Sequence, residues 1–304
     1  MSTPQNLSLN APLVSIVTPS LNMGVYIEET IASVLAQDYG NLEYIVMDAG
    51  STDGTVNILR KYEGRLQYTS QPDGGTADAI NKGFARSRGS ILAFLNADDT
   101  YLPGAISTAV SALSANPNVA MVYGEGNRVN QQGEFVGRYP TAPFDRKRLE
   151  RECFICQPAS FFRREAFEAI GGMDPKLHYT FDYDLWIRMT QLFELRNING
   201  LLATARSHAA NKTLGHPRST VEETISLLRS HFGYVPLQWI CRYSSMLLSE
   251  KDASPYEDVL PSVASYCLCL PVGMLMNRHH PMRYLGEWGH LLIDNRFTRA
   301  VPKR

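Results

Sequence analysis

Phe94-Leu95-Asn96-Ala97-Asp98-Asp99-Thr100 is an apolar run that ends abruptly in two adjacent carboxylates. Acids at the end of a buried strand cost desolvation energy unless a cation or a polar ligand meets them. Carboxylate oxygens suit a hard divalent cation, which usually shares its coordination shell with water and substrate phosphates. The stretch therefore predicts a metal site and indicates diphosphate chemistry.

A second group of acids lies in Asp48-Ala49-Gly50-Ser51-Thr52-Asp53-Gly54-Thr55, directly after the apolar run Tyr44-Ile45-Val46-Met47. In open α/β sheets, ligands bind at the carboxyl ends of the strands. Two strands that end in acids should therefore face one crevice, and we expect both acid groups to contact the same ligand.

Residues 13–95 alternate short β-branched runs with segments of helical periodicity, which is typical of βαβ units. We expect strands at residues 13–18, 44–47, 66–70, 91–95 and 119–123. Pro19 should end the first of them. Apolar residues recur at helical spacing in 26–37, 76–86, 103–115 and 182–189. The predicted class is α/β, with a mostly parallel central sheet flanked by helices.

Composition limits the range of functions. The chain of 304 residues is long enough for one large domain and an appendage. Its formal net charge of -1 gives no basic field, so we expect no nucleic-acid partner. The polar start, Met1 to Pro12, does not resemble a secretory signal, and we expect a cytoplasmic protein. Cys153 and Cys156 lack a second ligand pair at zinc spacing, so we expect buried free thiols.

From Ser219 onward the pattern is helical, and residues 259–277 carry no charge. Pro261 and Pro271 interrupt this segment, which leaves three alternatives: a membrane-spanning helix, a helix that contacts a membrane surface, or a buried helical pair. Basic residues follow it directly, namely Arg278, His279, His280 and Arg283.

Seven short motifs occur in a fixed order along the chain. They are Val14 to Asn22, Asp48 to Thr55, Asp73-Gly74-Gly75, Asp78 to Gly83, Asn96 to Asp99, Gln157 to Phe162 and Phe181 to Trp186. The ordered set resembles the inverting glycosyltransferases of family 2, which have the Rossmann-like GT-A fold. The resemblance implies an N-terminal tail at 1–12, a GT-A domain at 13–213 and a helical extension at 214–304 that can contact a membrane.

Within this resemblance, Asp48 corresponds to the acid that accepts a hydrogen bond from the nucleotide base, which suits the N3–H of uracil. The alternative is an aspartate that only shapes the turn before the next helix. Asp53 is expected to order the loop as a helix cap. The base and ribose would lie on the segment that contains Thr18, Pro19, Ser20 and Asn22.

The resemblance also implies where the rest of the donor binds. Donor-binding positions would be Asp73, Gly74, Gly75, Asp78, Asn81, Asn96, Ala97, Asp98 and Gln157. Asp98 and Asp99 would hold Mn²⁺ or Mg²⁺ against the diphosphate, and His208 is either a further metal or diphosphate ligand or an ordinary surface histidine. Asn96 stands where many relatives carry another aspartate, so the site has one charge fewer.

Phe181-Asp182 occupies the place of the family's Glu-Asp motif. The resemblance assigns Asp182 as the base that deprotonates the acceptor hydroxyl. Asp184 is the alternative base, although capping the helix or pairing with Arg188 suits it better.

The resemblance thus implies a transferase that moves one sugar from a nucleotide-diphosphate donor, which we expect to be a UDP-sugar, to an acceptor hydroxyl with inversion. It is closest to bacterial enzymes of surface-polysaccharide and O-antigen assembly, whose saccharide acceptors can be lipid-linked at the inner face of the membrane. A non-catalytic nucleotide-sugar binding module is one alternative. A nucleotidyltransferase is another, but Thr18 to Gly24 lacks the basic residues that a triphosphate needs. The sequence does not specify the sugar, the linkage or the oligomeric state.

Overall fold

The computed structural model describes residues 11–248 and 262–293, and these form two compact units. The first unit contains residues 11–146 and 153–207, and the second contains residues 147–152, 208–248 and 262–293. Residues 1–10 of the expected tail, and 249–261 and 294–304 of the expected extension, lie outside the described residues.

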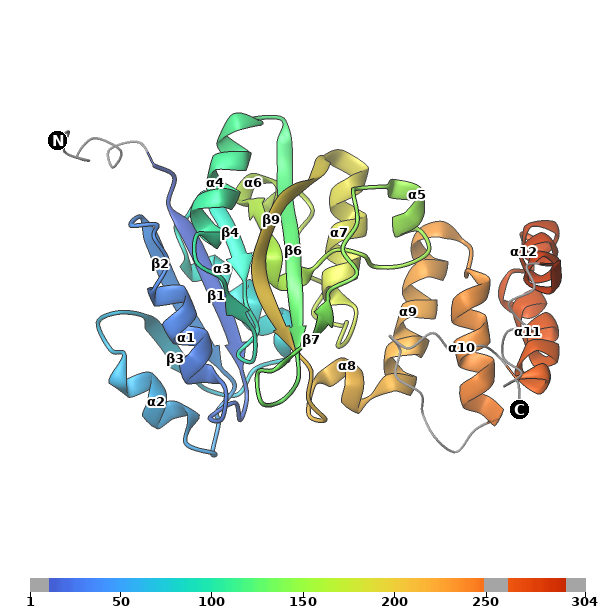
Figure 1. The fold of residues 1–304 in the computed structure, drawn as a ribbon, viewed down its shortest axis with the longest axis horizontal. Coiled ribbons are helices and arrows are strands. Elements are labelled where there is room, and N and C mark those ends of the chain that lie inside the picture. Colours follow the sequence, from blue (N-terminus) through green and yellow to red (C-terminus); the bar gives the residue numbers. More distant parts are fainter. Residues whose placement is uncertain (1–10, 249–261, 294–304) are drawn as a thin grey trace. The chain divides into compact units, whose positions relative to one another are not determined.

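Within the described residues, the first unit is built on a nine-stranded sheet in the order β3-β2-β1-β4-β8-β6-β9-β5, with β7 beside β6 (Figure 1). The strands are β1 (Val14–Ser20), β2 (Leu42–Asp48), β3 (Gln67–Ser70), β4 (Ile91–Phe94), β5 (Thr100–Tyr101), β6 (Val119–Val129), β7 (Phe135–Arg138), β8 (Ser160–Arg163) and β9 (Glu194–Arg206). The β3-β2-β1-β4 half is parallel, and β8 joins it antiparallel to β4. The predicted α/β class is confirmed.

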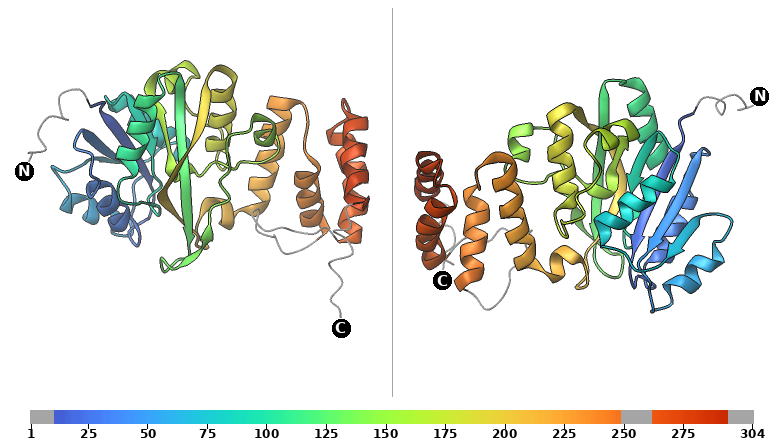
Figure 2. Two further views of the ribbon diagram at one scale, coloured as in Figure 1. Left: turned by 45° about the horizontal axis from the view of Figure 1, so that its top comes forward. Right: turned by 180° about the vertical axis from the view of Figure 1, so that it is seen from behind.

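Helices cover both faces of this sheet (Figure 2). They are α1 (Ile27–Leu35), α2 (Thr55–Lys61), α3 (Thr76–Arg86), α4 (Ala105–Ala115), α6 (Arg164–Ala169) and α7 (Phe181–Leu192). α1 and α4 contribute to the hydrophobic core that contains Val14 and Ile16 of β1, with α1 against β5 and α4 against β6 and β9. α3 packs on the other face, where a Cβ added to Gly83 would meet Val17 at 2.5 Å. That glycine lets the helix approach the strand closely.

Pro19 does not end β1, contrary to the expectation from sequence, and the strand continues to Ser20. β1 pairs with β4 only as far as Val17, whereas its pairing with β2 extends to Ser20. The carbonyl of Val17 accepts from Leu95 on the β4 side, and the carbonyl of Ser20 accepts from Ala49 on the β2 side. Successive residues of a strand direct their backbone N–H and C=O groups to opposite sides. Pro19 therefore faces the same side as Val17, towards β4, where pairing has already ended, so its missing N–H costs no hydrogen bond.

β9 is a strand of 13 residues that no sequence expectation covered. Polar residues at Arg196, Asn197 and Asn199 obscure the alternation that would have indicated a strand. The partners of β9 are β6, which lies parallel to it, and β5, which lies antiparallel. Its extended conformation therefore depends on pairing with strands that are distant in the sequence.

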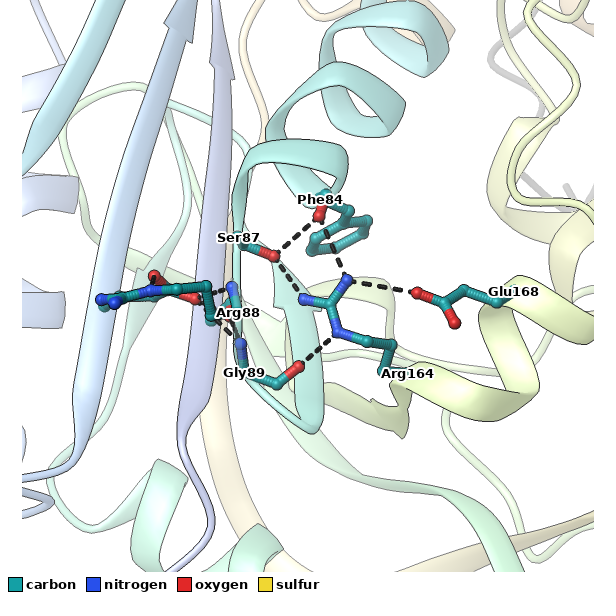
Figure 3. Close-up of polar contacts among 8 residues, drawn as sticks. Phe84, Ser87, Arg88, Gly89, Arg164 and Glu168 are labelled. Carbon is teal, nitrogen blue, oxygen red and sulfur yellow. Dashed lines mark hydrogen bonds and ion pairs between the residues drawn. The ribbon is translucent and has the colours of Figure 1, made fainter.

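Arg164, at the start of α6, satisfies backbone carbonyls where α3 ends and β4 begins (Figure 3). Its Nε donates to the carbonyl of Gly89 at 2.6 Å, and Nη1 donates to the carbonyl of Phe84 at 3.2 Å. Nη2 donates to Ser87 Oγ at 2.6 Å, and Glu168 lies 3.4 Å from Nη1. The last carbonyls of a helix lack partners within the helix, and this arginine supplies hydrogen-bond donors at the C-terminal end of α3.

The second unit is helical. Its main helices are α8 (Lys212–Gly215), α9 (Pro217–Phe232), α10 (Leu237–Leu248), α11 (Val263–Met276) and α12 (Pro281–Ile293), and α5 (Arg146–Leu149) lies at the boundary. Asn277 joins the end of α11 to the segment before α10, because its side-chain amide exchanges two hydrogen bonds with the backbone of Val235, at 2.8 and 2.9 Å. Pro271 lies inside α11 rather than breaking it.

Across the described residues, every helix is too short or too polar to cross a membrane.

Candidate active site

Three neighbouring parallel strands, β2, β1 and β4, end at one edge of the sheet. Ser20 and Asp48 are register partners at the ends of β1 and β2. The acid turn, which we define as residues 96–99, follows β4. The structure therefore brings the two acid groups of the sequence to the same edge, where α/β proteins bind their ligands.

Asp48 is almost completely buried, and its carboxylate is the centre of the β2–α2 loop. Oδ2 accepts from the backbone N–H groups of Gly50 and Ser51, at 3.1 and 2.9 Å. The hydroxyls of Ser51 and Ser70 donate to Oδ1 at 2.5 Å and to Oδ2 at 2.6 Å. Three of these four bonds go to Oδ2 and one to Oδ1, from the loop and from Ser70 at the end of β3. A carboxylate oxygen offers about two lone-pair sites, so Oδ1 keeps one for a further donor.

Asn22 joins this loop to the end of β1. Its backbone N–H donates to Ser51 Oγ at 2.7 Å, and its Oδ1 accepts from the N–H of Thr52 at 2.9 Å. Asn22 has a φ of 54°, a left-handed conformation that asparagine tolerates better than most residues. The N-cap of α2 is Gly54 and not Asp53, but the carboxylate of Asp53 orders the loop as expected: it accepts from the N–H groups of Thr55 at 3.0 Å and of Gly24 at 2.8 Å. These contacts fix the backbone around the space beside Ser20.

Ser20 Oγ is buried and has no hydrogen-bond partner among the described residues. A buried hydroxyl without a partner is costly, and such atoms in proteins often meet a ligand or water. By contrast, Thr18 Oγ1 pairs with Tyr44 OH at 3.0 Å inside the core. Pro19 and Ala97 are also buried. Of these residues predicted to bind the donor, only Ser20 offers an unpaired side-chain group.

The acid turn buries two carboxylates side by side, with Asp98 7% and Asp99 6% exposed. Burial raises the pKa of Asp99 well above its ordinary value, and the charge of Asp98 raises it further. Hydrogen bonds from the N–H of Arg206 at 3.0 Å and from Asn96 Nδ2 at 3.3 Å act in the opposite direction. An added positive charge at this turn would relieve the repulsion.

Asn96 acts in this turn as a hydrogen-bond donor. Its Nδ2 lies 3.3 Å from Asp99 Oδ2 and 3.1 Å from Gln157 Oε1, both of which are acceptors. Gln157 in turn donates from Nε2 to the carbonyl of Phe94 at 2.8 Å. A chain of hydrogen bonds thus runs from the end of β4 through Gln157 and Asn96 to Asp99. An aspartate at position 96 could not donate either bond.

The segment predicted to contact the donor sugar forms the tight start of α3. Asp73 Oδ1 accepts from the N–H of Gly75 at 2.7 Å, and Asp78 Oδ2 accepts from the N–H of Gly74 at 2.7 Å. Lys82 pairs with Asp78 at 2.6 Å, and this bond, followed by that from Gly74, lowers the pKa of Asp78. Lys82 is therefore bound to a carboxylate of its own helix.

Asn81 has a structural contact instead of an exposed amide. Its Nδ2 and Oδ1 each bond the backbone of Met173 at 2.9 Å. These two bonds hold the segment before α7 against α3. Binding a donor through the same amide would break at least one of them.

Asp182 lies in the first turn of α7, and its Oδ1 accepts from the N–H of Tyr183 at 2.8 Å. The adjacent Phe181 packs against Phe94 of β4, with ring centroids 6.2 Å apart, so the start of α7 lies beside the end of β4. Asp184 is buried and pairs with Arg188 at 2.6 Å, as the spacing of four residues predicts. Its carboxylate is thus held by an arginine, which is the pairing that the sequence favoured for Asp184. The assignment of Asp182 as the base stays a prediction.

The donor set at the acid turn suits a hard divalent cation, because two buried carboxylates meet there with excess negative charge. Among residues 11–248 and 262–293, no three His, Cys, Asp or Glu side chains are grouped to hold a metal. Further ligands would therefore be water and phosphate oxygens. His208 belongs to the second unit, where its N–H donates to Asn211 Oδ1 at 2.5 Å, and its contact with a metal stays a prediction.

Arg206 is the residue of the site that sequence reasoning missed. It ends β9 and contacts the acid turn through its backbone and its side chain. Its position two residues before His208, in a segment already compared with the family, was the available signal.

Comparison with known proteins identifies the class. The model of glycosyl transferase family 2 matches residues 15–171. An uncharacterized glycosyltransferase of Rickettsia prowazekii is 30% identical over 221 residues, which are 68% of this chain and 67% of that protein. The chain belongs to glycosyl transferase family 2, as the motifs predicted.

One further sequence relative and two solved structures of similar fold are informative. A chondroitin synthase of Pasteurella multocida is 27% identical over 207 residues, 67% of this chain but 21% of that protein. TarS of S. aureus, solved with UDP-GlcNAc, has a TM-score of 0.63 and 14% identity, over 90% of this chain and 83% of that one. A mannosyltransferase of Pyrobaculum calidifontis, solved with GDP-Man and Mn²⁺, has a TM-score of 0.56 and 18% identity, over 97% of this chain and 82% of that one. The predicted GT-A fold is confirmed.

Asn96→Asp should make the stability of the protein depend on a divalent cation. Without metal, the third carboxylate faces two acceptors, and we expect the free energy of unfolding to fall by about 1–3 kcal/mol. Thermal unfolding in EDTA and in excess Mn²⁺ measures this, and the deficit should shrink with Mn²⁺. Asn96→Ala removes the donor without adding charge, so its deficit should not respond to metal. If Mn²⁺ reduced the loss of stability equally in Asn96→Asp and Asn96→Ala, the account would be contradicted.

Proposed function

We propose that this chain transfers one sugar from a UDP-sugar to an acceptor hydroxyl, with inversion at the anomeric carbon. The observation that carries the proposal is the shared edge of β1, β2 and β4, which holds the Asp48 loop, the unpaired hydroxyl of Ser20 and the buried acid turn. The TarS and mannosyltransferase complexes contain nucleotide-sugars, which supports a donor of this class.

The nucleotide part of the donor would lie on the loops after β1 and β2. Asp48 Oδ1 accepts only the bond from Ser51 Oγ, so it can also accept the N3–H of uracil, and Ser20 Oγ gains a partner from the ligand. Fixed backbone groups around Asn22 would orient the ribose without reorganisation, which favours binding.

The diphosphate would lie at the acid turn. Asp98 and Asp99 would hold Mn²⁺ or Mg²⁺, and when bound the cation neutralises charge on the departing nucleoside diphosphate. Asn96 and Gln157 keep Asp99 in place.

Asp182 would act as the general base. It would take the proton of the acceptor hydroxyl while the acceptor oxygen attacks the anomeric carbon from the side opposite the diphosphate, and this direct displacement inverts the configuration. The packing of Phe181 on Phe94 places this residue beside the strand that leads to the acid turn.

The acceptor, in this proposal, is a saccharide of bacterial surface polysaccharide or O-antigen, carried on a lipid. The second unit supports work at a membrane surface. α11 has no charged residue, and Val263 and Leu275 on it are 74% and 75% exposed. Arg278 and Arg283, just beyond it, are exposed cations that suit anionic lipid headgroups.

Calorimetric titration of UDP, GDP and dTDP tests the donor assignment directly. Wild-type protein should bind UDP, more tightly than the other two, and only with Mn²⁺ or Mg²⁺ present. Asp98→Asn should weaken this binding at least about tenfold, because metal ligands and their supports typically contribute that much. Asp38→Asn, in the connection between α1 and β2, is the control and should bind normally. No binding of any nucleotide to folded wild-type protein would refute the proposal.

Asp182→Asn should reduce the turnover number by about 10²–10⁴-fold, the usual contribution of a general base. The dissociation constant for UDP should stay unchanged, since the donor does not contact this residue. Release of UDP from a UDP-sugar in the presence of saccharide acceptors measures the rate. Asp184→Asn should instead lower the melting temperature, because it leaves Arg188 without its ion-pair partner. A fully active Asp182→Asn enzyme would assign the base elsewhere.

Co-sedimentation with vesicles tests the membrane contact. Vesicles rich in phosphatidylglycerol should pellet the protein, and neutral phosphatidylcholine vesicles should pellet much less of it. Replacing both Val263 and Leu275 by serine should reduce the bound fraction by removing exposed apolar area. A protein that stays in the supernatant with both kinds of vesicle would remove this part of the proposal.

A further inference from the structure

Arg206 is a buried arginine, and each nitrogen of its guanidinium binds an acceptor of the protein. Its side chain is 4% exposed. Nε donates to the carbonyl of Asp98 at 3.1 Å, and Nη1 donates to the carbonyl of Gln131 at 3.2 Å. Nη2 pairs with Glu29 Oε2 at 2.5 Å, and the guanidinium lies 5.3 Å from the ring centroid of Tyr26. Four segments distant in the sequence thus meet at one side chain.

The same residue holds the acid turn from two directions. Its backbone N–H donates to the carboxylate of Asp99 at 3.0 Å, while its side chain binds the backbone carbonyl of Asp98. On α1, Thr30 Oγ1 donates to the carbonyl of Asp99 at 2.8 Å. The peptide unit between the two acids is itself held at both ends, because its carbonyl, that of Asp98, accepts from Arg206 and its N–H, that of Asp99, donates to the carbonyl of Asn96 at 3.1 Å. This peptide sets the direction in which the Asp98 carboxylate leaves the backbone.

Charge explains why an arginine suits this position. A buried cation is tolerated only when its donors are satisfied, and the planar fork of arginine can reach three acceptors that lie in different directions. The carboxylate of Glu29 is 62% exposed, so water screens part of its effect on Arg206. The positive charge of Arg206 remains available to offset the repulsion between Asp98 and Asp99. Lysine carries the same charge but cannot make three bonds in this geometry.

We propose that Arg206 is a positioning residue, which holds the acid turn so that Asp98 faces the diphosphate of the donor. This inference rests on the proposed function, because it concerns the same site. Arg206 acts through Asp98 and Asp99, and its own N–H groups are used by the protein. Its side chain can be changed without removing the backbone bond to Asp99, so substitution isolates the contribution of the guanidinium.

The test compares Arg206→Lys and Arg206→Met with Arg196→Met. Arg196 lies on the same strand, pairs with Glu194 at 2.7 Å and is 43% exposed, so it serves as a control for removing an arginine from this strand.

Two quantities are measured for each protein: the dissociation constant for UDP in Mn²⁺, well below the melting temperature, and the melting temperature in EDTA. Arg206→Lys should weaken UDP binding by about 10- to 100-fold in protein that is still folded at the temperature of the titration, the usual effect of losing a residue that orients a ligand-holding carboxylate. Its melting temperature should also fall, because the carbonyls that Arg206 binds lose donors. Arg196→Met should bind UDP normally.

Glu29→Gln separates charge pairing from positioning. It leaves the bond from Arg206 to Asp98 intact, so its effect on UDP binding should be smaller than that of Arg206→Lys. A purely structural role of Arg206 would lower the melting temperature of its variants without changing the dissociation constant of the folded protein.

The outcomes are distinct. If wild-type protein binds UDP with Mn²⁺ and both Arg206 variants bind it equally well, the inference is wrong while the proposed function stands. If neither Arg206 variant folds, Arg206 has a structural role and the inference is also wrong. If wild-type protein binds no nucleotide, the proposed function fails and this inference fails with it.

Discussion

Two carboxylates buried side by side at the end of β4 repel each other, and the surrounding structure is arranged around that repulsion. Asp99 receives hydrogen bonds from Asn96 and from the backbone of Arg206, and the carbonyls of the turn are bound by Thr30 and by the Arg206 side chain. These donors come from α1, from the acid turn itself and from the end of β9. The arrangement lowers the cost of burying the acids without removing it, since the pKa of Asp99 stays raised. A divalent cation would complete the neutralisation, and it could also bind the phosphate oxygens of a donor.

The parallel half of the sheet determines what else lies near these acids. Because β2, β1 and β4 run in the same direction, the loops after them share one edge. The loop at Asp48 is rigid, as its carboxylate organises four donors within the loop and on β3. Ser20 Oγ lies beside it without a partner. One edge therefore combines a preformed loop, an unpaired buried hydroxyl and excess negative charge, which together suit a nucleotide diphosphate with its cation.

Features that depend on local sequence were predictable. α3 begins and ends at the residues that its periodicity indicated, and both acid groups follow strands as expected. Features that depend on distant partners were not. β9 is held extended by β6 and β5, and Pro19 stays in β1 because β4 ends early. The contacts of Asn81 with Met173 and of Arg206 with the acid turn join residues far apart in the chain, and no spacing along the sequence encodes them. The family motifs indicated the candidate site, whereas the hydrogen-bond partners of its polar atoms could be known only from the fold.

A crystal structure of the protein with UDP and Mn²⁺, with an anomalous difference map recorded above the manganese absorption edge, tests the central claim most directly. The account predicts one manganese peak bonded to a carboxylate oxygen of Asp98 and to phosphate oxygens of UDP, with the uracil at the Asp48 loop. A manganese peak away from the acid turn, or a nucleotide bound elsewhere while the acid turn stays empty, would contradict it.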